Sequence, residues 1–251
     1  RKKEYLNVAQ MTELYQVFIN KQYPESWQKV YREKVHFSLG LFLLQYLCNG
    51  FNLADAARLR YNDYYFFSGK KAFQFMRYKT KDRSENNSEV VIPIIEPLKN
   101  ILSEIAAPEE KGALVFPSIL KGETDEMAIR KMIALENSNI QDRMKKLVVF
   151  LGWEIFPSST WCRHSFATNL THAGVPINYI SESMGHSHNE SVTARYIDIF
   201  PHEQQVSYNN RLLDISSDDR SDLTEILKSL SPAELNSILD AVRHKNSLSR
   251  L

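Results

Sequence analysis

Residues 158–170 read SSTWCRHSFATNL, residues 184–187 read MGHS, and residues 192–196 read VTARY. The first segment places Arg163 beside Trp161, Cys162 and Phe166, a setting that would partly bury its guanidinium group. A buried cation calls for an anionic partner, because an unpaired charge is costly to remove from water. Arg163 is therefore a candidate anion-binding residue.

In this order and at close to this spacing, the three segments resemble the C-terminal signature of the tyrosine recombinases, also called phage integrases. The stretch that begins at Arg163 matches the family's Arg-His-Thr-Phe-Ala-Thr core, Gly185-His186 matches its Gly-His element, and Tyr196 ends its nucleophile element. One such piece would be a weak signal, but the ordered set is specific. Weaker resemblance upstream, in residues 49–63 and around Lys79, extends the match over roughly residues 1–200.

The resemblance implies an enzyme that cleaves and rejoins double-stranded DNA without a metal, a cofactor or ATP. Tyr196 would attack the scissile phosphorus and hold the 3′ end as a phosphotyrosine. Arg163 would bind the phosphate through its planar fork, and Lys79 would protonate the departing 5′-oxygen. His186 would hydrogen-bond the phosphate or assist proton transfer. These roles describe a site-specific recombinase, here an integrase of a mobile element.

Several of these residues also have a structural interpretation. The chain has twelve tyrosines, so Tyr196 taken alone resembles a half-buried packing residue, and His186 could simply cap a helix. Lys81 lies two residues after Lys79 on the same strand face, although the pairing of lysine with threonine favours Lys79 as the acid. The neighbouring histidines complete no recognised metal-ligand spacing, so we expect no metal.

The chain departs from the family pattern at two positions. Asn52 stands where the family usually has an arginine, and Thr160 stands where it usually has a histidine. Thr160 can still donate a hydroxyl hydrogen bond to phosphate, but it carries no positive charge. The sequence resembles the integrases of conjugative transposons, a subgroup that includes active members without the first arginine. A DNA-binding module that has lost cleavage is the alternative.

The net charge of the chain is only +1, so the local distribution of charge is more informative. Residues 69–83 are strongly basic, whereas residues 214–225 are acidic. Such asymmetry favours a basic face that binds phosphate, although a charged cluster is often only a solvated surface. The residues that we expect to contact DNA are Arg60, Lys70, Lys71, Arg77 and Lys81.

The expected fold is mainly α with a small three-stranded antiparallel β-sheet, an α+β arrangement. Apolar residues at helical spacing predict a buried helix over residues 35–47, a short helix follows from Leu53 to Leu59, and Thr12 is the expected cap of the first helix. Aromatic and β-branched runs predict strands at residues 64–67, 72–78 and 90–95.

We expect residues 1–210 to form the recombinase catalytic domain and residues 211–251 to form a linker and a terminal helix. That helix has an apolar face and could be exchanged between subunits of a tetramer on DNA. The resemblance implies that a DNA-clasping domain precedes this region. No apolar run long enough to span a bilayer and no signal-peptide pattern occur in the sequence, and the two cysteines fit a reduced, cytoplasmic setting.

Overall fold

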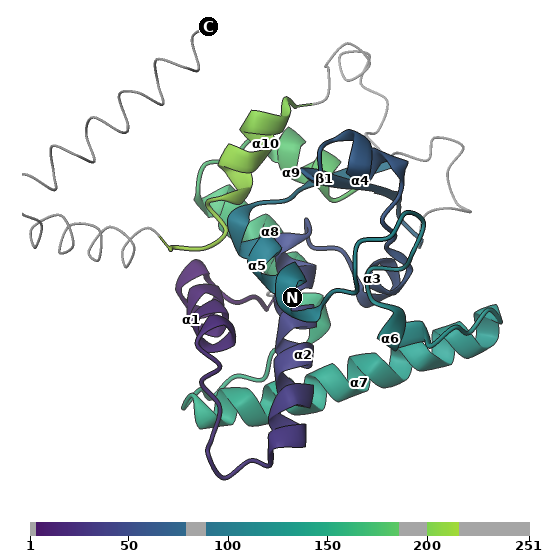
Figure 1. Cartoon of the computed structure of the whole chain (residues 1–251). Helices are drawn as coiled ribbons and strands as arrows, with labels where there is room; N and C mark the ends of the chain where they lie inside the picture. Colours follow the sequence, from purple (N-terminus) through teal and green to yellow (C-terminus); the bar gives the residue numbers. More distant parts are fainter. Residues whose placement is uncertain (1–3, 79–88, 186–199, 216–251) are drawn as a thin grey trace, which may run out of the picture. The chain divides into compact units, whose positions relative to one another are not determined.

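Helix α2 (Lys29–Leu47) forms the centre of the fold because its second half is apolar on nearly every side. All residues from Ser38 to Leu47 are buried, as expected for a helix that is covered by neighbours all round. In Figure 1, α2 runs through the middle of the molecule. The helices that contact it most extensively are α1 (Val8–Ile19), α5 (Glu96–Ile105), α7 (Glu126–Phe150) and α8 (Ser159–His172).

The computed structural model describes residues 4–78, 89–185 and 200–215, and those up to Leu213 form one compact unit. Among these residues, no helix is long and apolar enough to cross a membrane. The predicted terminal helix lies outside the described residues. The remaining elements are short: α3 (Leu53–Arg58), α4 (Asp63–Phe67), β1 (Ala72–Met76), β2 (Glu89–Pro93), α6 (Pro117–Leu120), α9 (Ile177–Ser183) and α10 (His202–Asn209).

The described residues contain a two-stranded antiparallel sheet, so the prediction of three strands is wrong. Strands β1 and β2 pair from Ala72 with Pro93 to Met76 with Glu89. The first predicted strand, at residues 64–67, is instead helix α4. The Asn62 side chain accepts a hydrogen bond from the Tyr65 backbone and so caps a helical turn. Local capping outweighs the β-propensity of this aromatic run.

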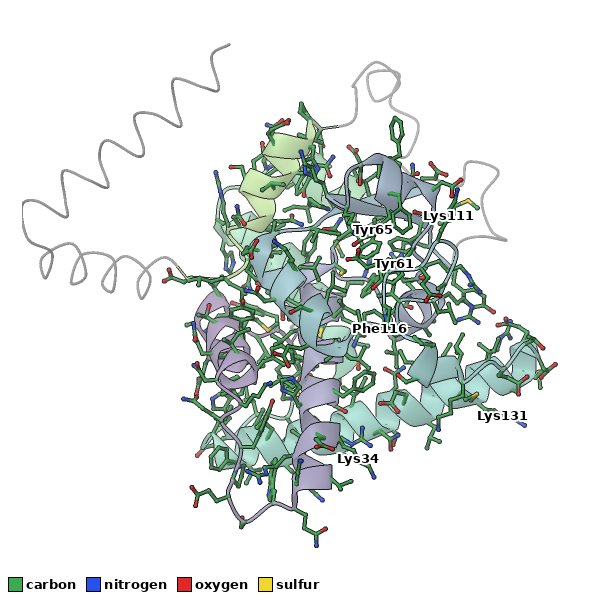
Figure 2. The ribbon with its side chains drawn as sticks, viewed as in Figure 1. Lys34, Tyr61, Tyr65, Lys111, Phe116 and Lys131 are labelled. Carbon is green, nitrogen blue, oxygen red and sulfur yellow. The ribbon has the colours of Figure 1, made fainter. Side chains whose placement is uncertain are left out.

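The aromatic side chains of α4 nevertheless pack on the sheet. The ring of Tyr65 stacks on Phe73 of β1 with a centroid distance of 4.9 Å, and Tyr61 lies 5.1 Å from Tyr65. Figure 2 shows these two tyrosines beside each other. Residues 64–67 therefore pack against the sheet as a helix and do not form one of its strands.

The predicted helices over residues 35–47 and from Leu53 to Leu59 are confirmed as parts of α2 and α3. The prediction for α1 is wrong at its start. Asn7 caps this helix in a reciprocal capping box with Gln10, and Thr12 lies inside it with its hydroxyl on the Val8 carbonyl. A threonine one turn inside a helix can bond to the backbone in this way, so it resembles a cap in the sequence.

Candidate active site

Arg163 lies in the first half of α8, and its guanidinium group forms hydrogen bonds to two loops. Its Nη1 donates to the Gly50 carbonyl at 3.1 Å, and its Nη2 donates to the Met184 carbonyl at 3.0 Å. Gly50 lies in the loop after α2, and Met184 is the C-cap residue that directly follows α9. The arginine predicted to bind phosphate is thus partly buried and held in place by backbone acceptors.

A second arginine, Arg77, converges on the same carbonyl from the end of β1. Its Nη1 donates to Met184 O at 2.6 Å, and only 8% of the residue is exposed. Sequence analysis listed Arg77 among the residues expected to contact DNA, and that role stays a prediction. The structure places Arg77 beside Arg163, where both guanidinium groups donate to the carbonyl at the C-terminus of α9. The partial negative charge of a helix C-terminus favours cations at this position.

The carboxylate of Asp55 lies close to this pair of arginines. Its carboxylate lies 3.6 Å from Arg77 Nε and accepts a hydrogen bond from the Tyr78 backbone at 2.9 Å. Its side chain is fully buried. Sequence analysis missed Asp55, although its position three residues after Asn52, in a capping box, was a usable signal.

The two arginines of this cluster repel each other, and the effect is seen in the pKa of Arg163. Burial first, and then repulsion from Arg77, lowers the pKa of Arg163 to about 10, while Asp55 opposes this fall. Arg163 therefore stays a cation at neutral pH. An anion bound beside the two arginines would lower the repulsion between them.

Two glycines allow the close approaches at this site. A Cβ atom at Gly50 would lie 3.0 Å from the Cα of Arg163, and one at Gly185 would lie 2.7 Å from Cδ of Arg77. Both glycines also have positive φ, at 63° and 64°. A larger residue at either position would be disfavoured both by the backbone conformation and by the lack of space for a Cβ atom. Gly185 is the residue directly before His186.

The two positions that depart from the family pattern have different surroundings. Thr160 is exposed in the first turn of α8, one turn before Arg163, and its hydroxyl lies 2.8 Å from that of Ser158. Asn52 caps α3, because its side-chain oxygen accepts a hydrogen bond from the Asp55 backbone at 2.9 Å. The asparagine therefore has a structural task where the family has a cation.

Three of the residues expected to contact DNA lie away from this cluster. Lys70 pairs with Glu109 at 2.5 Å, and Lys71 directly precedes the end of β1 remote from Arg77. Lys71 and Arg77 are six steps apart along an extended chain, which is about 20 Å. Arg60 donates to the Gly112 carbonyl at 2.7 Å. The structure thus brings Arg77, but not these three, to Arg163.

Four predicted site residues, Lys79, Lys81, His186 and Tyr196, lie outside the described residues. The described chain stops at Tyr78 and at Gly185 on either side of the arginine pair. Within residues 4–78, 89–185 and 200–215, no group of three His, Cys, Asp or Glu side chains gathers in a way that could hold a metal ion.

Comparison with known proteins assigns the chain to a family. Among solved structures, it is similar to an integrase from mycobacterium phage Brujita, with 16% sequence identity and a TM-score of 0.47 over 85% of the chain. The chain spans 60% of the length of that integrase. No curated protein matches it. The model of the phage integrase family matches residues 6–203, and the chain therefore belongs to that family.

Proposed function

We propose that this chain is the catalytic domain of a site-specific DNA recombinase, an integrase, that forms a 3′-phosphotyrosine intermediate on Tyr196. The observation that carries the proposal is the convergence of Arg163 and Arg77 on the Met184 carbonyl, one residue before Gly185-His186. A paired and partly buried set of guanidinium groups suits a phosphate diester.

The reaction proceeds in two steps that conserve the number of phosphate ester bonds. The Tyr196 oxygen forms a bond to phosphorus as the bond from phosphorus to the 5′-oxygen breaks. Lys79 gives its proton to the departing 5′-oxygen, and His186 accepts the proton that the Tyr196 hydroxyl loses. A new 5′-hydroxyl then attacks the phosphotyrosine in the reverse sense, so ligation needs no ATP.

The arginine pair stabilises the charge that builds up on the non-bridging oxygens. Arg163 presents its planar fork to the phosphate, and Thr160 adds a hydroxyl donor from the turn before. Arg77 supplies the second positive charge, in place of the arginine that is absent at Asn52. Loss of one such donor typically reduces catalysis by about a hundred- to a thousandfold, so the replacement is needed for activity.

One observation favours a second candidate function, a DNA-binding module without cleavage. Asn52 is committed to the cap of α3 and adds no charge to the site. In this alternative, Arg77 serves only to hold Met184 and Asp55 in place. The two candidates differ in whether a covalent bond to DNA forms.

We further propose that the chain belongs with the conjugative-transposon integrases, because Asn52 replaces the first arginine. Residues 1–210 form the catalytic domain in this proposal. Residues 211–251 pass to a neighbouring subunit in a tetramer assembled on DNA.

The test is the formation of an SDS-resistant complex with labelled DNA. The substrate is a nicked duplex from the junction of the genetic element that carries the gene. The parent chain, Tyr196→Phe and Arg77→Met are compared at equal DNA occupancy. A labelled adduct that disappears in Tyr196→Phe, and falls about a hundredfold in Arg77→Met, supports the recombinase and the replacement. Specific binding without any adduct supports the binding module.

A further inference from the structure

Glu126, the first residue of α7, has several donors gathered on a single oxygen of its carboxylate. The Tyr78 hydroxyl donates a hydrogen bond to Glu126 Oε1. Arg58 Nη2 lies 2.8 Å from the same oxygen, and Arg130 Nε lies 3.4 Å from it. Arg58 is the last residue of α3, Tyr78 follows β1, and Arg130 belongs to α7 itself. Donors from separate parts of the fold therefore converge on one anionic oxygen.

The donors also contact one another without involving the carboxylate. Arg130 Nη2 donates to the Tyr78 hydroxyl at 3.2 Å. The guanidinium carbon of Arg58 lies 3.8 Å from the centre of the Tyr78 ring, within the range of a favourable cation–π contact. Arg58 Nη1 is held by the Ala54 carbonyl at 3.1 Å. We therefore expect the three side chains to keep this arrangement if the Glu126 carboxylate moves away.

Glu126 is the exposed member of this group of residues that can be displaced. Its side chain is 46% exposed, and ion pairs at the surface contribute little to stability. The hydrogen bond from Tyr78, followed by that from Arg58, lowers the pKa of the Glu126 carboxyl, so it is ionised at neutral pH. The helix dipole favours an acidic residue in the first turn of α7, but it does not explain why donors from outside α7 meet there.

The converging donors lie next to the candidate active site. Tyr78 directly follows Arg77 in the chain, and its N–H donates to Asp55, whose carboxylate also lies 3.6 Å from Arg77 Nε. DNA carries one phosphate per nucleotide on each strand, so a duplex held at Arg77 and Arg163 presents further phosphates on either side. Guanidinium and hydroxyl groups are common donors to the DNA backbone.

We propose that Arg58, Tyr78 and Arg130 form a second phosphate site for the DNA backbone, and that the Glu126 carboxylate occupies this site until DNA displaces it. The inference rests on the proposed function, because it takes DNA as the ligand. Carboxylate and phosphate oxygens accept the same charge-assisted hydrogen bonds, so one can replace the other. Glu126 therefore weakens DNA binding, whereas a carboxylate that only held the arginines in place would strengthen it.

The test measures how tightly the full chain binds a fluorescently labelled duplex of arbitrary sequence, by anisotropy at about 0.1 M salt. Glu126→Gln keeps the shape of the side chain and removes its charge. We expect this variant to bind about three- to fivefold more tightly than the parent, the upper part of the range for one surface charge pair. Glu104→Gln is the matched control, because Glu104 pairs with Lys21 at 3.0 Å and its side chain is 40% exposed. Its gain should be less than half as large.

Removal of the arginines tests whether Glu126 acts through them. In a chain that also carries Arg58→Gln and Arg130→Gln, the gain from Glu126→Gln should fall to that of the Glu104→Gln control. Arg130→Gln is also measured alone, since its side chain is 65% exposed and the fold depends little on it. The slope of log K against log salt concentration should become shallower by about 0.9, the change for one lost phosphate contact.

The second phosphate site is overturned if Glu126→Gln gains no more affinity than Glu104→Gln, or if its gain persists without the arginines. An unchanged salt slope in Arg130→Gln overturns it as well. The adduct on Tyr196 tests the proposed function separately. An adduct without a selective gain in Glu126→Gln overturns the second site alone. A selective gain without any adduct supports the second site and overturns the cleavage reaction.

Discussion

Replacing Asp55 with asparagine should destabilise the fold and, at the same time, create a stronger anion site. The carboxylate is fully buried and lies 3.6 Å from Arg77 Nε. At an effective dielectric constant of about 20, this separation corresponds to about 5 kcal/mol of attraction. Asparagine avoids the carboxylate's desolvation cost, which offsets part of that loss, but its amide can accept fewer of the hydrogen bonds from Tyr78 and Asn52.

We therefore expect Asp55→Asn to lower the free energy of unfolding by about 3 kcal/mol, the lower end of the range for breaking a buried ion pair. Urea denaturation at pH 7 in dilute chloride measures this change. Asp63→Asn is the control, since Asp63 forms a 3.0 Å pair with Lys111 in which both side chains are largely exposed. The control should lose less than about 0.5 kcal/mol.

Sulfate then distinguishes an anion site from a simple structural ion pair. Asp55→Asn leaves Arg163 and Arg77 without their carboxylate, so a doubly charged oxyanion should bind the variant more tightly. Sulfate stabilises most proteins because it is excluded from their surface. The Asp63→Asn control measures the size of this general effect. Asp55→Asn should regain at least about 1 kcal/mol more than the control on exchange of chloride for sulfate. The charge argument would be refuted if Asp55→Asn lowered the free energy of unfolding by less than about 1 kcal/mol in chloride. It would also be refuted if sulfate stabilised Asp55→Asn and Asp63→Asn equally.

Other predictions test the geometry, the histidine and the terminal segment. Gly185→Ala should reduce adduct formation more than tenfold, because its Cβ would strike Arg77; Gly69→Ala, at similar φ in open space, should leave it unchanged. Burial, only partly opposed by Glu104, lowers the pKa of His36, so the unfolded state binds more protons below pH 6.5. Urea denaturation between pH 7 and pH 5 should therefore show a steeper loss of stability in the parent chain than in His36→Gln. Removal of residues 222–251 should abolish tetramers on DNA in light scattering and leave single-site binding intact.

The sequence was most informative for features that depend on residues close together in the chain. The neighbours of Arg163 in sequence predicted that its side chain is partly buried, and this is confirmed. Its role in binding phosphate stays a prediction. The helix over residues 35–47 was predicted from apolar spacing alone. In each case the deciding residues lie within a few turns of one another.

The errors arise where contacts connect distant parts of the chain. The place of Arg77 beside Arg163 was not predicted, because its bond to Met184 joins residues 107 apart in sequence, although the expectation that it contacts DNA is untested. Asp55 gave a helix-capping signal, but its contact with Arg77 depends on the fold. The α4 error is different, because the cap at Asn62 was visible in the sequence and the aromatic run obscured it.

The same contacts explain how the chain can tolerate Asn52. An arginine at that position would extend from the N-terminus of α3, where the exposed backbone N–H groups already carry partial positive charge. Asparagine there caps the helix and orients Asp55, and Asp55 in turn holds Arg77 from the end of β1. Under the proposed function, the second cation has moved from one element to another while remaining beside Arg163. If that is correct, restoring arginine at Asn52 in the Arg77→Met background should recover adduct formation only in part, because the α3 cap is lost.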